Sequence, residues 1–276
     1  MIIACGTVLF RKYPLEKALE TIRGIGYDYV ETQAVGSWCP HVDIDKDDPI
    51  KYYELMKKHG FRGTTALWMP HGAILNDDKC VEWGLRTLEW ASTAGIPVVN
   101  TGDGFKPSIM DDEEAYRIYE DRMGRLIEAA EQNKTVIAIE PHGTFSLTGT
   151  GLVRLMSISD TKWLGINFDA CNFVLSAFEE TKKTPYSQNE MSDRTDILGI
   201  FKKVFRRVVH FHAKDFMKGV FVPLGEGVVP LVECISLLKE YKYTGAVSLE
   251  TQGDEEYEIS RTFASMGYKY LNEHIK

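Results

Sequence analysis

Thr135-Val136-Ile137-Ala138-Ile139-Glu140-Pro141-His142-Gly143 is a run of β-branched and small apolar residues that stops at an acid, a proline, a histidine and a glycine. Such an uninterrupted apolar run predicts a strand that is buried on both faces. Proline cannot continue a central strand, so Glu140 is expected to be its last regular residue. Buried parallel strands that end in ionisable groups are typical of α/β enzymes, which place their chemistry at the carboxyl edge of the sheet.

The same kind of strand recurs along the chain and alternates with segments of helical spacing. Eight such units are the pattern of a (β/α)8 barrel. No linker rich in proline, glycine or serine divides the sequence, so residues 1–276 are predicted to form one α/β domain, a single (β/α)8 TIM barrel. A polar stretch near 179–193 interrupts the rhythm and is interpreted as a lid or a partner-binding insertion. The predicted strands cover residues 2–10, 27–32, 61–68, 96–100, 135–140, 164–169, 207–212 and 246–250.

The composition excludes several classes of partner. The net charge is −8, from 32 Lys and Arg against 40 Asp and Glu, and no basic run is longer than a pair. A nucleic acid or an anionic membrane surface would require clustered basic residues, so neither is expected as a partner. The first residues lack the pattern of a signal peptide, and no apolar run reaches membrane-spanning length. Five cysteines without a CxxC pair fit reduced thiols, so a cytoplasmic protein is expected.

The last four predicted strands end in residue types that bind metals, namely Glu140, Asp169, His212 and Glu250. In a closed barrel these strand ends are neighbours on one rim. Three carboxylates and one imidazole would repel there unless they were protonated or bound to a cation. The set suits a divalent ion, Mn²⁺ by preference, with Mg²⁺, Co²⁺ or Zn²⁺ as alternatives. His210 shares the face of His212 one layer deeper, where we expect a hydrogen-bonded core histidine.

Six short motifs follow one another along the chain: Gly26-Tyr27-Asp28-Tyr29-Val30-Glu31, Ile139-Glu140-Pro141, Asn167-Phe168-Asp169, His212-Ala213-Lys214-Asp215, Pro223-Leu224-Gly225-Glu226-Gly227 and Ser248-Leu249-Glu250. In order and spacing they resemble the xylose isomerase-like TIM-barrel superfamily, the sugar phosphate isomerases and epimerases, over nearly the whole chain. The resemblance implies that Glu140, Asp169, His212 and Glu250 are the metal ligands. It also implies that Glu140 and Glu250 move protons.

The sequence departs from this family at one position. Many members of the epimerase branch carry histidine three residues after the aspartate that ends the sixth strand, and here that residue is Asn172. Asparagine can hydrogen-bond a sugar hydroxyl but cannot shuttle protons near neutral pH. His142, two residues past Glu140, is an additional catalytic acid/base candidate because imidazole titrates in the useful range. The alternative for His142 is a loop histidine bonded to backbone. The candidates for substrate binding are Trp68, His71, Asp103, Asn172 and Lys214.

Proton abstraction next to a carbonyl is the chemistry that such a site would support. The predicted function is a divalent-metal-dependent sugar isomerase/epimerase that acts on a ketose or keto-sugar through a metal-bound enediolate. The alternative is a metal-dependent lyase or dehydratase acting on a 3-keto sugar or inosose, including the catalytic subunit of a C-glycoside deglycosylase. A homo-oligomer is expected, or a complex with a small β-rich partner subunit in the case of a C-glycoside lyase.

Two further classes fit the sequence less well. A non-catalytic sugar-binding barrel need not keep all four ligands. A metal-independent aldolase would need a Schiff-base lysine at a strand end, and the nearest candidate, Lys214, belongs to the motif quoted above.

Overall fold

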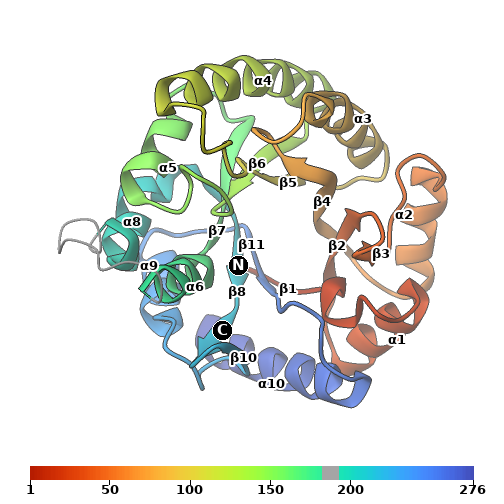
Figure 1. Cartoon of the computed structure of the whole chain (residues 1–276). Helices are drawn as coiled ribbons and strands as arrows, with labels where there is room; N and C mark the ends of the chain where they lie inside the picture. Colours follow the sequence, from red (N-terminus) through yellow and green to blue (C-terminus); the bar gives the residue numbers. More distant parts are fainter. Residues whose placement is uncertain (182–192) are drawn as a thin grey trace.

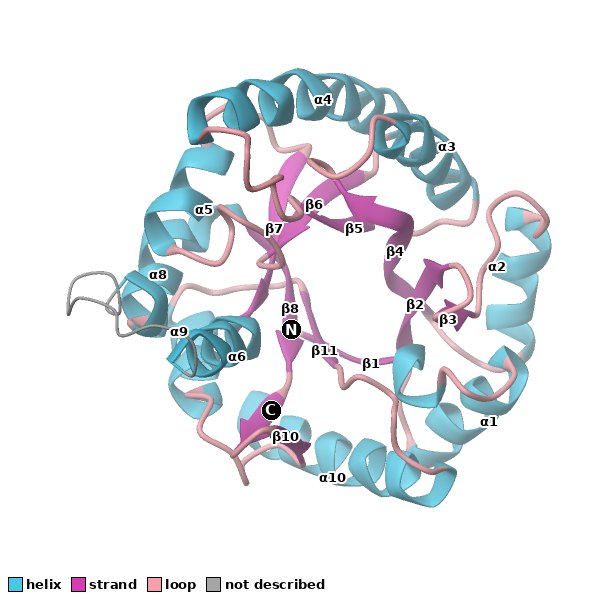
Figure 2. Cartoon of the chain, in the orientation of Figure 1, coloured by secondary structure: helices cyan, strands magenta, loops and turns pink. Residues whose placement is uncertain are grey.

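The computed structural model describes residues 1–181 and 193–276, without the side chains of residues 71, 72 and 179–181. Most of the insertion predicted near 179–193 therefore lies outside the described residues. Eight parallel strands close into a barrel in the order β1-β11-β8-β7-β6-β5-β4-β2, with β2 pairing back to β1, and helices surround them (Figures 1 and 2). The predicted (β/α)8 barrel is confirmed. The barrel strands are β1 (Ile2–Gly6), β2 (Tyr29–Val35), β4 (Gly63–Ala73), β5 (Val98–Gly102), β6 (Val136–Glu140), β7 (Leu164–Asp169), β8 (Val208–Ala213) and β11 (Ala246–Leu249).

Short 3-10 helices and strands lie between the main strands and helices of the barrel. The strand expected over 2–10 ends at Gly6, because the chain turns into the 3-10 helix η1 (Thr7–Phe10). A second 3-10 helix, η2 (Phe205–Arg207), leads into β8. The short strand β3 (Cys39–Pro40) pairs with β2. Strand β9 (Asp215–Met217) pairs with β10 (Val220–Val222). The described helices are α1 (Leu15–Ile25), α2 (Pro49–Lys58), α3 (Lys79–Thr93), α4 (Asp112–Asn133), α5 (Gly149–Met156), α6 (Ala170–Thr181), α8 (Ile197–Val204), α9 (Leu231–Glu240) and α10 (Tyr257–Ile275).

Two further properties of the described chain concern membrane-spanning helices and disulfide bonds. None of the described helices combines the length and the apolar character that a bilayer crossing requires. All five cysteines are buried and carry free thiols, so no disulfide supports the barrel.

Helix α6 was not predicted, and a single aspartate accounts for its start. The Oδ1 atom of Asp169 accepts hydrogen bonds from the backbone N–H groups of Cys171 (2.8 Å) and Asn172 (3.1 Å). A carboxylate that accepts from first-turn amides caps a helix and compensates its unpaired donors. Strand β7 therefore passes directly into α6, and the Oδ2 atom of Asp169 is left to face the barrel mouth.

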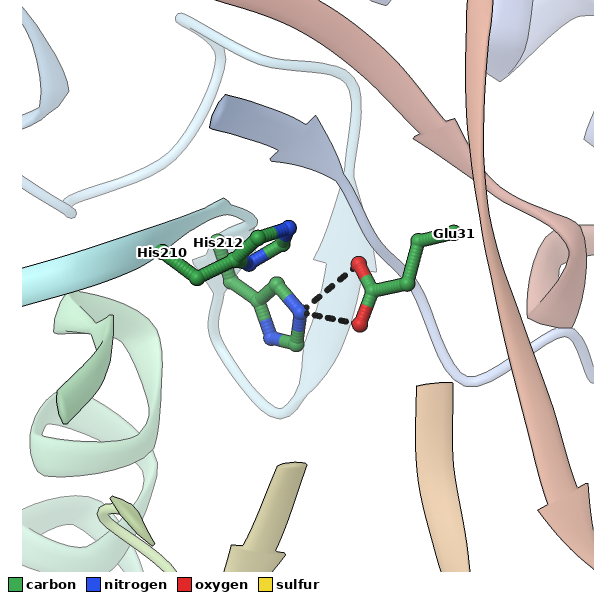
Figure 3. Close-up of side chains that lie close together, drawn as sticks. All are labelled: Glu31, His210 and His212. Atoms are coloured by element: carbon green, nitrogen blue, oxygen red, sulfur yellow. Dashed lines mark hydrogen bonds and ion pairs between the residues drawn. The ribbon is translucent and has the colours of Figure 1, made fainter. Parts of the chain in front are cut away.

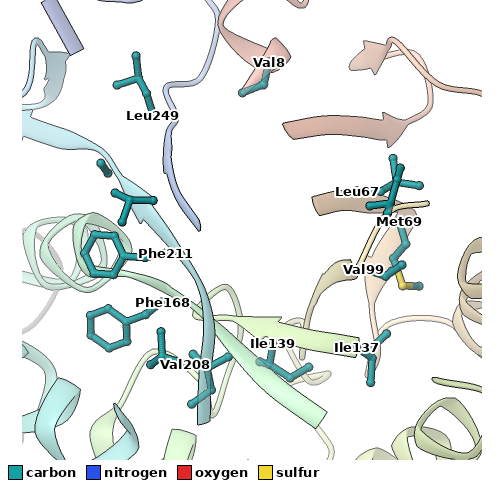
Figure 4. Close-up of a cluster of buried hydrophobic side chains, with 14 of the residues drawn as sticks. Val8, Leu67, Met69, Val99, Ile137, Ile139, Phe168, Val208, Phe211 and Leu249 are labelled. Atoms are coloured by element: carbon teal, nitrogen blue, oxygen red, sulfur yellow. The ribbon is translucent and has the colours of Figure 1, made fainter. Parts of the chain in front are cut away.

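Alternation along the strands separates the core from the site. Ile137 and Ile139 of β6 belong to the large hydrophobic cluster between barrel and helices, part of which is shown in Figure 4. Ala138 lies in a small separate cluster with Ala66 and Val98. Because side chains alternate in a strand, Glu140 shares the inward face of Ala138. The outer face thus stabilises the fold, and the inner face carries the chemistry.

The register of the strands sets two inward-facing levels near the mouth. Asn167 of β7 pairs with His210 of β8, and Asp169 pairs with His212. His212 is also level with Ser248 of β11. The residues between them on β7 and β8 point outward into the hydrophobic cluster. A lower polar level, with Asn167 and His210, therefore supports an upper level with Asp169 and His212.

Candidate active site

The four predicted strand-end residues meet at the carboxyl rim of the barrel. One ligand atom from each of Glu140, Asp169, His212 and Glu250 can be chosen so that all four atoms lie within 4.8 Å of one another. All four side chains are buried. The convergence expected from the strand ends is therefore present in the structure.

His212 presents a different nitrogen to each side of the site. Its Nδ1 atom lies 3.3 Å from Glu140, 3.7 Å from Asp169 and 3.4 Å from Glu250. Its Nε2 atom lies 2.9 Å from both oxygens of Glu31, as Figure 3 shows. In the protonated ring both nitrogens donate to carboxylates, whereas in the neutral ring a hydrogen on Nε2 donated to Glu31 would leave the Nδ1 lone pair directed toward the other three. This pairing of a histidine with a carboxylate fixes its tautomer and ring orientation, as in many metal sites.

The cluster of carboxylates requires positive charge. Burial opposes protonation of His212, but Glu250, Glu31 and Glu140 outweigh that effect and raise its pKa well above the ordinary value. The buried ammonium of Lys214 lies 2.7 Å from Asp169 and 2.7 Å from Glu250. Asp169 Oδ2 is buried and accepts no hydrogen bond of regular geometry, although it makes this ion pair. Three carboxylates and one imidazole nitrogen form a ligand set that fits a divalent cation. The buried Oδ2 atom of Asp169, which accepts no regular hydrogen bond, is consistent with such a site.

Glu140 and Glu250 have opposite electrostatic environments. Burial raises the pKa of Glu140, and the nearby charges of Glu250 and Asp169 add to the increase. Burial acts on Glu250 in the same direction, but His212 and Lys214 outweigh it and hold its pKa well below the ordinary value. Two carboxylates whose surroundings separate their pKa values are typical of an acid and base pair.

Hydrogen bonds fix the position of the Glu140 carboxylate. Oε2 accepts from the indole of Trp68 (3.1 Å) and from the amide of Asn167 (3.1 Å). Oε1 accepts from the amide of Asn172 (2.7 Å). The ring of His142 lies beside this carboxylate, with Nδ1 4.0 Å from Oε1. Trp68 and Asn172 are thus in contact with the cluster itself, and His142 stands next to it with a side chain that is 54% exposed.

A cavity of about 410 Å³ opens over this cluster. Its volume is within the range of about 300–1,000 Å³ that small-molecule sites occupy. Several residues that line it can hydrogen-bond or stack on a polar ligand: Gln33, Trp38, Trp68, Glu140, His142, Lys214, Glu250 and Gln252. The cavity thus exposes two of the four cluster residues, Glu140 and Glu250, to a bound molecule.

A family model described as a xylose isomerase-like TIM barrel matches residues 19–268. The chain belongs to the xylose isomerase-like TIM barrel family. No curated protein sequence matches the chain.

Solved structures share the fold of this family member at low sequence identity. A D-tagatose 3-epimerase-like protein is 18% identical with a TM-score of 0.74, and the match covers 100% of both chains. The probable 3-DHS dehydratase AsbF from Bacillus anthracis, involved in petrobactin synthesis, is 16% identical with a TM-score of 0.74 over 99% of both chains. The IOLI protein with a binding zinc atom is 16% identical with a TM-score of 0.74, and the match covers 100% of this chain and 98% of that one.

Asp103, a predicted substrate contact, is enclosed by the protein and bonded to the next loop. Its side chain is completely buried, and Oδ2 accepts hydrogen bonds from the backbone N–H groups of Phe145 (2.7 Å) and Ser146 (3.2 Å). The hydroxyl of Ser146 donates to its other oxygen. Asp103 therefore anchors the loop after β6 and has no oxygen available to a ligand. The side chain of His71, another predicted contact, lies outside the described residues.

Two inward-facing residues near the cluster were not among the predicted site residues. Glu31, 1% exposed, was quoted only as the end of a family motif and was given no role, because its partner His212 is far away in sequence. Asn167 was likewise quoted in a motif without a role, yet its amide reaches Glu140 and its Oδ1 accepts from His210 Nδ1 at 3.0 Å. The alternation of the strands could have identified both, since each lies on the inward face.

His210 is the hydrogen-bonded core histidine that the sequence predicted. Its Nδ1 pairs with Asn167 and its Nε2 lies 3.1 Å from the hydroxyl of Thr65. Burial lowers its pKa to about 4, so it is neutral near neutral pH. The ring is 1% exposed and supports Glu140 from below through Asn167.

Proposed function

We propose that this protein is a divalent-metal-dependent sugar isomerase or epimerase that acts on a ketose or keto-sugar. It removes a proton from the carbon next to the carbonyl and returns it at the same or the neighbouring carbon. The observation that carries the proposal is the arrangement of Glu140 and Glu250, which belong to the four-residue cluster and also line the cavity above it. Membership of the xylose isomerase-like family supports the same class of reaction.

Glu140, Asp169, His212 and Glu250 would hold the metal ion. The oxygen-rich set favours Mn²⁺, with Mg²⁺, Co²⁺ or Zn²⁺ as alternatives, and the zinc atom in the IOLI protein shows that one structural relative binds such an ion. When bound, a divalent ion polarises the substrate carbonyl and acidifies the adjacent C–H. Glu31 would keep Nδ1 of His212 directed at the cluster by accepting the hydrogen of Nε2.

The two glutamates would carry the proton. Glu250 directly follows β11 and Glu140 ends β6, with β8 and β7 between them in the barrel order, so they approach a ligand from different sides. Both carboxylates line the cavity over the cluster, so one can accept the substrate proton while the other returns one. Return to the opposite face of the same carbon gives an epimer, and return to the neighbouring carbon gives an isomer. The amides of Gln33 and Asn172 and the indole of Trp68 would orient the sugar hydroxyls.

Elimination is the second candidate, and His142 is the observation that favours it. Asn172 occupies a position where many epimerases of the family have a histidine, so it cannot return a proton there. The imidazole of His142 lines the same cavity and lies 4.0 Å from Glu140, where it could protonate a leaving group. The reaction would then be that of a lyase or dehydratase on a 3-keto sugar or inosose, including a C-glycoside deglycosylase catalytic subunit. The fold shared with the probable dehydratase AsbF is consistent with this candidate.

Elemental analysis followed by proton NMR in D₂O tests the proposal. The purified protein is expected to bind about one equivalent of a divalent ion and to incorporate deuterium next to the carbonyl of a ketose or 3-keto sugar. The change Glu250→Gln should abolish the exchange, whereas the exposed control Glu240→Gln should not affect it. The product distinguishes epimer, isomer and unsaturated sugar. If the protein binds no divalent ion and exchanges no hydrogen of any ketose or 3-keto sugar tested, the proposal is wrong.

A further inference from the structure

A second cavity lies beside the one over the carboxylate cluster. Its volume is about 440 Å³, against about 410 Å³ for the first. His142 lines both cavities, so the two adjoin at this residue. Each volume alone is within the range of a small-molecule site. A single sugar ring seated over the cluster would therefore occupy the first cavity and leave the second one open.

The second cavity joins the reaction centre on the side of Glu140. Asn172 lines it while its amide donates to Glu140 Oε1 at 2.7 Å. The same amide lies 3.5 Å from Nδ1 of His142. A substituent that passes His142 and Asn172 would thus be attached to the part of the sugar that faces Glu140.

Apolar side chains gather in one part of the second cavity. The first cavity exposes carboxylates, amides and an ammonium group beside the indoles of Trp38 and Trp68. The second is lined by Phe105, Pro141, Leu147 and Leu175, together with the polar residues Thr144 and Ser176. Phe105 has 61% of its surface exposed, and an aromatic ring so exposed beside a cavity is available to stack on a ligand. Arg194 also lines this cavity, where its guanidinium donates to Ser176.

We propose that the second cavity binds the aglycone of a keto-sugar glycoside, an apolar group of about the size of an aryl ring. The substrate would then be a glycoside with its sugar ring over the carboxylate cluster and its aglycone beyond His142. This inference rests on the proposed function for the identity of the sugar. It adds the substrate class, because a free ketose would leave the second cavity, with its exposed Phe105 ring, unfilled.

Calorimetric titration with two matched ligands tests this inference. The Mn²⁺-loaded protein is titrated with methyl and with phenyl 3-keto-β-D-glucopyranoside, which differ only in the aglycone. The phenyl glycoside is expected to bind at least about tenfold more tightly, because contact of its ring with Phe105, Leu147 and Leu175 would bury additional apolar surface. Phe105→Ala, at an exposed loop position, should reduce this preference about fivefold or more, as should Leu175→Trp, which fills the cavity. The matched control Val153→Trp places the same indole on the exposed face of α5 and should keep the preference of the wild type.

The outcomes separate this inference from the proposed function. Equal affinities for the two glycosides, no binding of the phenyl glycoside, or a preference that survives both cavity variants would overturn the assignment of the second cavity. The deuterium exchange described above is measured on the same samples. A phenyl preference that both variants abolish, without any exchange, would retain the aglycone site and overturn the isomerase or epimerase reaction instead.

Discussion

Replacing Glu31 by glutamine should weaken metal binding while leaving the four ligands in place. Glu31 is buried, and both of its oxygens lie 2.9 Å from His212 Nε2. Its Oε1 atom also accepts a hydrogen bond from the amide of Asn100 at 3.0 Å. Glutamine keeps the size of the side chain but removes the negative charge, and it offers one acceptor oxygen to two donors. The tautomer of His212 that directs its Nδ1 lone pair at the carboxylates would then be less favoured.

The expected magnitude follows from the bond that is lost. A hydrogen bond to a charged group contributes about 1.5–3 kcal/mol. Loss of this contribution corresponds to roughly 10–100-fold weaker metal binding, which is the effect seen when the hydrogen-bond partner of a metal-binding histidine is changed. Competition between the protein and a chromophoric chelator for Mn²⁺ at neutral pH measures the change. Glu240→Gln, an exposed substitution of the same type on α9, is the control and should match the wild type.

Thermal unfolding in the presence of EDTA shows whether the Glu31→Gln protein remains folded. If it is folded and binds Mn²⁺ within about threefold of the wild type, Glu31 does not orient His212 and the reasoning is refuted. If it binds no metal but unfolds at a much lower temperature, Glu31→Asp provides the second comparison, since it restores the charge at a shorter reach.

Three further predictions concern single side chains. His212→Ala should lose bound metal and all turnover, and stoichiometric metal in this variant, measured by elemental analysis, would show that His212 is not a ligand. His210→Phe should retain metal but respond differently to acid. The folded pKa of His210, about 4, lies below its ordinary value of 6.5, so its contribution to stability is present above about pH 6.5 and is lost as the pH falls toward 4. Metal-free wild-type protein should lose about 3 kcal/mol from this group over that interval, and His210→Phe should not, as urea unfolding at several pH values can measure. Asp103→Ala should lower the free energy of unfolding by about 3 kcal/mol, because buried backbone donors of the next loop lose their acceptor, and an unchanged urea midpoint would contradict this role.

The barrel and the rim of candidate metal ligands could be predicted because both depend on local patterns. An apolar run that stops at Glu140 and Pro141 shows where a buried strand ends, whatever the rest of the chain does. The two-residue spacing of His210 and His212 predicts that both point to the same face of the strand. In the structure His210 lies at the lower polar level and His212 at the upper one, as expected. These properties follow from strand geometry within a few residues.

The remaining features depend on contacts between segments far apart in sequence. The bond of Glu31 to His212 joins β2 to β8 across the barrel, and the strand containing Glu31 gives no indication of its partner. Asp103 resembled a rim residue that contacts substrate, but the loop after β6 folds over it and uses its oxygens. Its role depends on the path of that loop, which the sequence near Asp103 does not determine.

The ammonium of Lys214 and the imidazole of His212 already lie among the carboxylates of the cluster. The acids are therefore neutralised in part by the chain itself, and we expect the barrel to fold before any ion arrives. Zinc fingers behave differently, because their ligands come together only when the metal binds. A metal ion would therefore bind after the barrel has folded. His212 would have to lose the proton on Nδ1 to become a ligand. Chelation should therefore empty the site reversibly without unfolding the protein.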